Sequence, residues 1–311
     1  MLNVLLSRLF LSLPVLIGAI FFGFLLLRVV PGDPASLLAG QSASADVVAR
    51  VRTEMGLDEP WILQFVHYFG QVTSGDLGRS IISNRPVLDE LSEALGPTVE
   101  LVLSALSLAV PLGITLGVIA AIYRGGMLDR AIMALAVAGI SLPVFWVAYM
   151  LILILGVQWN LLPFTGRLGP IWTLEGLQGL ALPALTAAFT LVGPIARISR
   201  TAVLETLYAE HVRLARAKGV PEHKVVVKHG LRNALLPIVT LVGLQIGHLL
   251  GGTVIIETIY AWPGVGRLVV GAIMNSDYAT AQGGLLLMAC IFVAVNLIVD
   301  LLYSTLDPRL S

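Results

Sequence analysis

Polar side chains able to do chemistry gather in one basic stretch, residues 200 to 237, within a sequence that is otherwise apolar. This stretch holds every lysine of the chain, namely Lys218, Lys224 and Lys228. A loop that binds nucleotide phosphates needs a lysine that follows a glycine and precedes serine or threonine. Gly, Val and His follow these three lysines, so we do not expect the chain to hydrolyse ATP itself.

Hydrolytic chemistry is not indicated either. The sequence contains no Gly-x-Ser-x-Gly turn, the element that exposes the nucleophile of many esterases. None of its five histidines is followed by another histidine four residues on, the spacing that binds zinc on one helix face. Cys290 is the single cysteine, which excludes an internal disulfide and a cysteine-rich metal site. We predict no catalytic residue, no metal site and no cofactor held by this chain.

A helix from Thr206 to Lys218 is predicted within the basic stretch, because these residues include no glycine or proline and are rich in Ala, Leu, Glu and Arg. Arg216 and Lys218 suit the negative end of its dipole. Gly219 fits the position just after a helix, and Pro221 prevents the helix from continuing. A helix that ends in this way is expected to lie outside the bilayer.

One face of this predicted helix is apolar. Tyr208, Val212 and Ala215 follow one another in steps of four and three residues, and Leu204 lies one turn earlier. Charged residues lie mostly on the other faces. A short helix of this kind is typical of docking into a groove on another protein. A helix lying on anionic lipid head groups is the alternative, and both interpretations place it in the cytoplasm.

The composition indicates a polytopic membrane protein. The chain has 311 residues, of which 57% are hydrophobic and 12% charged, and its mean hydropathy is +0.91. The formal net charge is zero, so nucleic acid is not an expected partner. Six segments come close to the length of about 20 apolar residues that a bilayer requires: residues 9–27, 99–122, 131–157, 180–198, 235–256 and 279–302.

The distribution of Lys and Arg predicts that both termini lie in the cytoplasm. With that orientation most of the basic residues outside the spans, including all three lysines, fall on the inner side. Arg8 precedes the first span and no small-residue cleavage site follows, so we predict a retained helix; a cleaved signal peptide is the alternative. The fold class predicted is therefore all-α, with six membrane helices.

Three regions are expected along the chain: a first membrane helix over residues 1–30, an external region over 31–97, and a five-helix core over 98–311 with a cytoplasmic loop at 200–236. Apolar and aromatic residues at helical spacing in 57–69 predict short helices on the outer face. Turns are expected at 75–78 and 84–86. The external region could seat a solute-binding protein or simply pack on the spans.

Proline and glycine within the spans predict how the helices pack. Bends or breaks are expected at Pro111, Pro143, Pro183 and Pro194. Small residues four apart predict close helix contacts, and they recur at Gly113 and Gly117 and at Gly243, Gly247 and Gly251.

Two polar residues lie within the fifth apolar segment. Gln245 and His248 are three residues apart and turned away from the glycines of that segment. Polar groups at this depth are costly unless they meet a cavity or a partner. They are the sequence-based candidates for a solute path, and a satisfied hydrogen bond between helices is the alternative.

Several motifs along the chain resemble those of one transporter family. Ala215-Arg-Ala-Lys-Gly219, followed by Lys228-His-Gly-Leu-Arg-Asn-Ala-Leu-Leu-Pro237, resembles the cytoplasmic coupling loop of binding-protein-dependent ABC importer permeases of the dipeptide, oligopeptide, glutathione and nickel group. Similar patterns occur, in order, at Arg28-Val-Val-Pro-Gly-Asp-Pro34, Gly56-Leu-Asp-Glu-Pro60, Gly75-Asp-Leu-Gly78, Trp262-Pro-Gly-Val-Gly-Arg267 and Asp300-Leu-Leu-Tyr303. The resemblance covers essentially the whole chain.

Two departures from the family pattern are present. Arg213, Leu214 and Ala215 stand where the generic loop begins Glu-Ala-Ala, and the Leu-Pro pair that ends at Pro237 falls later than in the generic form. Peptide-type members often carry Asp-Tyr where this chain has Glu210 and His211. The first departure leaves the family assignment intact, and the second leaves the type of cargo open.

The resemblance implies a pore subunit in the inner membrane of a prokaryote. Its implied partners are a second homologous permease subunit, two cytoplasmic ATPase subunits or domains that bind ATP and Mg²⁺, an extracytoplasmic solute-binding protein and membrane lipid. The implied cargo is a di- or oligopeptide, glutathione included, and a nickel chelate is the alternative. The residues expected to engage the ATPase are Leu204, Tyr208, Glu210, His211, Val212, Arg213, Ala215, Arg216 and Gly219.

A transporter driven by an ion gradient is the alternative from another class. Glu257, His248 or Asp300 would then couple proton movement to transport. Such a protein would act alone in proteoliposomes, whereas the importer needs ATPase partners. A membrane-embedded hydrolase ranks third and would depend on a single nucleophile.

Overall fold

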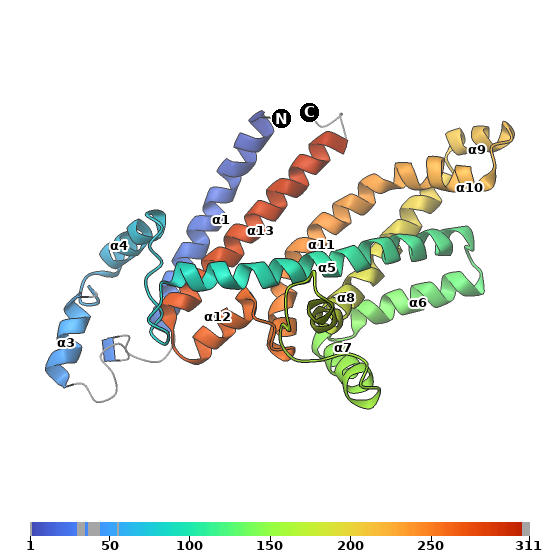
Figure 1. Ribbon diagram of the computed structural model, residues 1–311. Coiled ribbons are helices and arrows are strands. Elements are labelled where there is room, and N and C mark those ends of the chain that lie inside the picture. Colours follow the sequence, from blue (N-terminus) through green and yellow to red (C-terminus); the bar gives the residue numbers. More distant parts are fainter. Residues whose placement is uncertain (1, 30–34, 37–43, 55, 307–311) are drawn as a thin grey trace.

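The fold is helical over the residues that the computed structural model describes, which are 2–29, 35–36, 44–54 and 56–306. Turns and one isolated antiparallel bridge, between Arg79 and Pro86, connect the helices in this part of the chain. The predicted all-α class is thereby confirmed for the described residues, whose arrangement is shown in Figure 1.

Four helical segments are long and apolar enough to cross a membrane. They are α5 (Val87–Ile122), α8 (Leu174–Leu207), Glu222–Leu249, which includes most of α11 (Arg232–Ile259), and Tyr278–Val299 of α13 (Tyr278–Leu306). A bent pair of helices would make a fifth. Helix α1 (Leu2–Val29) contributes a shorter apolar stretch, Phe10–Leu25. The count of six spans stays a prediction.

The span predicted over residues 131–157 is not one continuous helix, and the break predicted at Pro143 is confirmed. The chain forms α6 (Met127–Ser141) and then a second helical piece, Val144–Gln158, bent from α6 by 106°. This piece is α7 (Val144–Leu151) followed by the π-helix η1 (Ile152–Gln158). Leu142 is extended, with ψ 131°, because the residue before a proline is disfavoured in the helical conformation. Pro143 therefore breaks the span, whereas Pro111, Pro183 and Pro194 lie inside continuous helices.

Helix α8 lies at the centre of the packing and contacts α5, α6, α7 and α11. Gly113 and Gly117 let α5 approach it closely, because a Cβ added to them would lie 2.7 Å from Ile195 Cγ2 and 2.5 Å from Ser199 Cβ. The predicted close contact is confirmed and lies within this chain.

The glycines of α11 serve a similar contact with α13. An added Cβ on Gly247 would lie 2.8 Å from Phe292, and Gly243 faces Val299 in the same way. Nothing lies within 4 Å of the corresponding position on Gly251. Two of the three glycines in this stripe therefore accommodate a neighbouring helix of the same chain.

Residues 45–73, in the region predicted to be external, form short helices as expected, namely α3 (Ala45–Glu54) and α4 (Trp61–Thr73). Phe65 of α4 packs edge-on against Phe21 and Phe24 of α1, with ring centroids 5.7 and 5.3 Å apart. The predicted turns are also present, since Gly75, Gly78 and Asn84 adopt positive φ. Aromatic contacts thus hold α4 against the first helix.

The ends of the helices divide between two sides of the molecule. In Figure 1, α9 (Glu210–Ala217) and α10 (Glu222–Lys224) lie at the upper right, and the start of α1 and the end of α13 lie at the top. Helices α3, α4 and α12 (Val265–Met274) lie toward the left and lower left. The basic loop, the start of α1 and the end of α13 are therefore separated from the short helices of residues 45–73 and 265–274.

Candidate functional site

The helix predicted over Thr206 to Lys218 is not continuous. Helix α8 runs on to Leu207, and the chain then turns at Ala209, whose ψ of 150° is extended, before α9 begins at Glu210. The break has a packing reason, because Leu207 and Val212 are both buried in one cluster. Five residues apart on a straight helix, they would point about 140° away from each other.

Helix α9 ends as the sequence predicts. Gly219 adopts φ +76° just beyond it. The Val220 N–H donates to the Ala215 carbonyl at 3.2 Å, and the Gly219 N–H donates to the Arg216 carbonyl at 2.9 Å. These two bonds make up a Schellman motif, which satisfies carbonyls at the helix end.

The residues of the predicted apolar face do not share one environment, because some are buried and others are exposed. Val212 is fully buried and Ala215 is 8% exposed, and both face this chain, whereas Tyr208 is 64% exposed. Leu204 belongs to α8 and is half-buried. The expectation that these four residues form one docking face is therefore wrong. Val212 and Ala215 anchor α9 on the rest of the protein.

The exposed face of α9 is polar and basic. It presents Glu210, His211, Arg213 and Arg216, together with Leu214, which is 63% exposed. A face with exposed charge around one large apolar side chain can contact another protein, because the apolar group supplies an anchor and the charges a polar rim.

Side-chain contacts fix α9 to the elements on either side. Arg216 donates to both carboxylate oxygens of Glu222 in α10, at 3.1 and 2.6 Å, and to the Leu207 carbonyl at 3.2 Å. The hydrogen bond to Glu222 raises the pKa of Arg216, so this guanidinium stays charged. His211 Nε2 lies 3.2 Å from Asn233 Nδ2 in α11. Helix α9 is thus joined to α8, α10 and α11.

A π-helix, η2 (Val225–Leu231), packs against α9. The sequence did not predict it. Val225 and Val226 of this π-helix are buried with Leu207 and Val212. Gly230 lies under Leu207, since an added Cβ there would be 3.0 Å from Leu207 Cδ2. Because π-turns are often found at functional sites, η2 adds weight to this region. The three consecutive valines, residues 225–227, do not indicate a π-helix.

A partly buried ion pair connects α8 to the first turn of α6. Arg200 donates from Nε and NH2 to the two oxygens of Asp129 at 2.6 and 2.7 Å, and Asp129 is only 4% exposed. The Gly125 N–H also donates to Asp129, at 2.8 Å. The Arg124 guanidinium from the turn before α6 lies 5.3 Å above the ring of Tyr208. The start of α6 therefore contacts α8, and the turn before it contacts the break that precedes α9.

The two solute-path candidates lie on α11. Gln245 is half-buried and His248 is exposed. Gly243 and Gly247 of the same helix face α13. The structure brings neither residue together with the α9 region, so the two groups of candidate residues lie apart. The role of Gln245 and His248 stays a prediction.

The carboxylate considered for proton coupling holds a helix in place. Glu257 is fully buried; its oxygens accept from Thr98 Oγ1 at 2.8 Å and from the Arg267 N–H at 3.0 Å. The second bond satisfies a free amide in the first turn of α12. A turn precedes this helix, and its Trp262 Nε1 donates to the Pro97 carbonyl at 2.8 Å. The side chain of Asp300 lies outside the described part of the structure.

Comparison with known proteins gives matches along the chain. The model of the family described as "Binding-protein-dependent transport system inner membrane component" matches residues 113–311. A second model, for the N-terminal part of such membrane components, matches residues 1–102. Glutathione transport system permease proteins GsiC of Escherichia coli O6:H1 and Salmonella choleraesuis are each 41% identical to the chain over 310 residues, covering 100% of it and 99% of the relative. The GsiC protein of Escherichia coli K12 is 40% identical over the same length.

Proposed function

The chain belongs to the family of inner-membrane components of binding-protein-dependent transport systems, and from this membership we propose that it forms part of the pore of an ATP-driven importer. It is a multi-pass permease subunit of the ABC transporter type. In the proposed topology six helices cross the membrane and both termini face the cytoplasm. The position of α9 on the same side of the molecule as the start of α1 and the end of α13 supports this orientation.

The proposed cargo is a small peptide, glutathione included. The support is the similarity to glutathione permeases along the full length of the chain. A nickel chelate remains the alternative within the same family. Gln245 and His248 of α11 are the proposed contacts with the solute, because polar side chains within an apolar helix are typical of a transport path.

The proposed assembly contains a second permease subunit, two ATPase subunits or domains and an external binding protein. The family description names a binding protein. The lysines of this chain lack the context of a phosphate-binding loop, so ATP and Mg²⁺ would be bound by the ATPase partners. The permease would then convert their movement into motion of its own helices.

The coupling proposal rests on one observation: α9 exposes one face and packs against the end of α8 with the other. Its exposed residues, Glu210, His211, Arg213, Leu214 and Arg216, are available to an ATPase together with Tyr208 at the end of α8, and Gly219 fixes the end of α9. Its buried Val212 belongs to the cluster that includes Leu207 at the end of α8. A push on α9 would therefore move α8 directly. From α8 the ion pair between Arg200 and Asp129 would pass the motion to α6.

Uptake measured in proteoliposomes tests the proposed function. Vesicles that contain the complete complex should import labelled glutathione or tripeptide only when ATP is inside and the binding protein outside. Vesicles that contain this chain alone should show no uptake when a proton or sodium gradient is applied. Gradient-driven uptake by the chain alone would instead establish an ion-coupled transporter.

A further inference from the structure

A cavity of about 560 Å³ opens on the side of the molecule away from α9. The turn of residues 80–85, the beginning of α5 and the residues of and around α12 line it. Small-molecule pockets in proteins commonly have volumes of roughly 300–1,000 Å³. In the proposed topology this cavity faces outward, where a solute released by a binding protein would first meet the permease.

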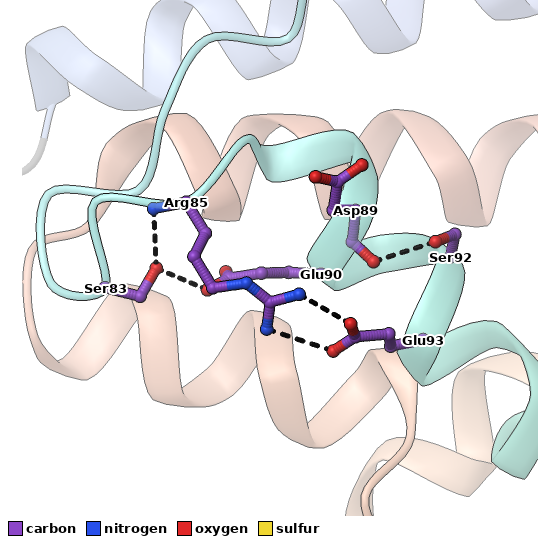
Figure 2. A network of polar contacts seen from close by, with 6 residues as sticks. All are labelled: Ser83, Arg85, Asp89, Glu90, Ser92 and Glu93. Carbon is purple, nitrogen blue, oxygen red and sulfur yellow. Dashed lines mark hydrogen bonds and ion pairs between the residues drawn. The ribbon is translucent and has the colours of Figure 1, made fainter.

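Charged groups of both signs line the cavity. They are Arg85, Arg167, Arg267, Glu90 and Glu93, together with the buried Asp277. Arg85 and Glu93 form a two-fold contact, in which Arg85 NH1 lies 3.1 Å and NH2 2.5 Å from the carboxylate oxygens, as Figure 2 shows. The hydrogen bonds to Glu93 raise the pKa of Arg85, which keeps it protonated.

The ion pairs at the cavity differ in how easily a ligand could replace them. The Arg85 and Glu93 side chains are 48% and 64% exposed, and exposed pairs of this kind contribute little to stability. Arg167 pairs with Glu100 instead, and these side chains are only 28% and 17% exposed. A solute could therefore separate Arg85 from Glu93 at a low cost in free energy.

The turn that carries Arg85 is fixed in place without using this ion pair. Ser80 Oγ donates to the buried Asp277 at 2.5 Å, which ties the turn to the start of α13. Ser83 Oγ accepts from the Arg85 N–H at 3.1 Å and donates to Glu90, as Figure 2 also shows. Separation of Arg85 from Glu93 would thus leave the backbone of the turn anchored and both charged groups at the cavity.

We propose that this cavity binds a small zwitterion, such as a short peptide with free ends, whose carboxylate pairs with Arg85 and whose ammonium group pairs with Glu93. A zwitterion replaces both halves of the resting pair, so neither charge is left without a partner. A ligand with one charge would leave Arg85 or Glu93 uncompensated, and a ligand with no charge would form neither ionic contact, so both would bind less well. Glu90, beside Glu93, adds a second acceptor for the ammonium group.

This inference rests on the proposed function and gives it an outward-facing subsite that selects for free peptide ends. Arginine suits the carboxylate because its planar fork of donors matches both oxygens. The subsite lies on α5 and the preceding turn, apart from Gln245 and His248 on α11, so one solute would meet the two places in succession.

Binding to the complete complex in nanodiscs, without ATP or binding protein, tests this inference. Saturation-transfer NMR should detect trialanine at millimolar concentrations, whereas N-acetyl-trialanine amide should bind at least about tenfold more weakly. Arg85→Ala and Glu93→Gln should each weaken trialanine binding by at least about tenfold. Asp89→Asn is the matched control, since Asp89 lies on the same helix outside the cavity lining, and its binding should be unchanged.

The inference is overturned if the blocked peptide binds as well as trialanine, if both cavity variants bind like the wild type, or if the wild type binds no trialanine. Co-purification of the ATPase partners with each variant checks that the complex assembles. Because this measurement needs no uptake, the subsite and the import function can fail separately.

Discussion

Arg200 Nε and NH2 lie 2.6 and 2.7 Å from Asp129 Oδ1 and Oδ2, so these two residues join α8 to α6 through a bidentate ion pair. Asp129 is 4% exposed, and its second contact is the Gly125 N–H. The geometry needs the planar guanidinium of arginine, because a lysine ammonium presents only a point charge. The pair is therefore a rigid connection between two helices of the proposed coupling path.

Removal of one partner of this pair should destabilise the protein. Asp129→Asn leaves the partly exposed Arg200 without a counter-charge and should lower the free energy of unfolding by about 2 kcal/mol. Arg200→Lys keeps the charge but loses one hydrogen bond and should cost about 1 kcal/mol. Thermal unfolding of the purified chain in detergent measures both changes.

The double variant Asp129→Asn, Arg200→Gln is the control for this pair. It removes both charges and should recover most of the stability that Asp129→Asn loses. Losses that simply add in the double variant would show that the two side chains do not interact. In the complex, Asp129→Asn should also lower the uptake obtained per ATP hydrolysed, if α8 drives α6 through this pair.

Gly117 should tolerate no side chain. A Cβ there would lie 2.5 Å from Ser199 Cβ and 2.6 Å from the Ala196 carbonyl oxygen, so α5 and α8 would have to separate. We expect Gly117→Ala to lower the free energy of unfolding by about 2 kcal/mol. Gly251→Ala on α11 is the matched control, because nothing lies within 4 Å there and alanine favours the helix by up to about 1 kcal/mol. Equal melting temperatures of the two variants would contradict the packing described.

Glu257 should matter for structure rather than for proton coupling. Glu257→Ala leaves the Thr98 hydroxyl and the Arg267 N–H without their acceptor and should lower the free energy of unfolding by about 3 kcal/mol. Glu257→Gln retains one oxygen and should cost less. Uptake by the Glu257→Gln complex should still require ATP, and its initial rate should not depend on an imposed proton gradient. If uptake by the wild-type complex depended on the proton gradient and Glu257→Gln abolished that dependence, Glu257 would have a role in proton coupling.

Local chemistry made several features predictable from the sequence. Gly219 and Pro221 predicted the end of α9, and the glycines of α5 and α11 predicted close helix contacts. These features depend on backbone freedom and on the size of one residue, so neighbours in the sequence reveal them. Pro143 was expected to bend or break its helix, but its effect could not be told apart from that of Pro111, which α5 accommodates.

Features that depend on distant residues were not predictable in this way. Asp129 and Arg200 are 71 positions apart, and Thr98 and Glu257 are 159 apart, so no local spacing indicated either contact. The helix propensity of residues 206–218 favoured one helix, yet tertiary packing of Leu207 and Val212 in one cluster broke it. Propensity is a weak preference that packing readily overrides.

Site-specific photocrosslinking from Leu214 tests the central claim most directly. Leu214 is 63% exposed on α9, and Trp172, 80% exposed in the segment before α8, is the control position. With a photoreactive amino acid in the assembled complex, position 214 should crosslink to an ATPase subunit and position 172 should not. No ATPase adduct from position 214, or an equal adduct from position 172, would contradict the account.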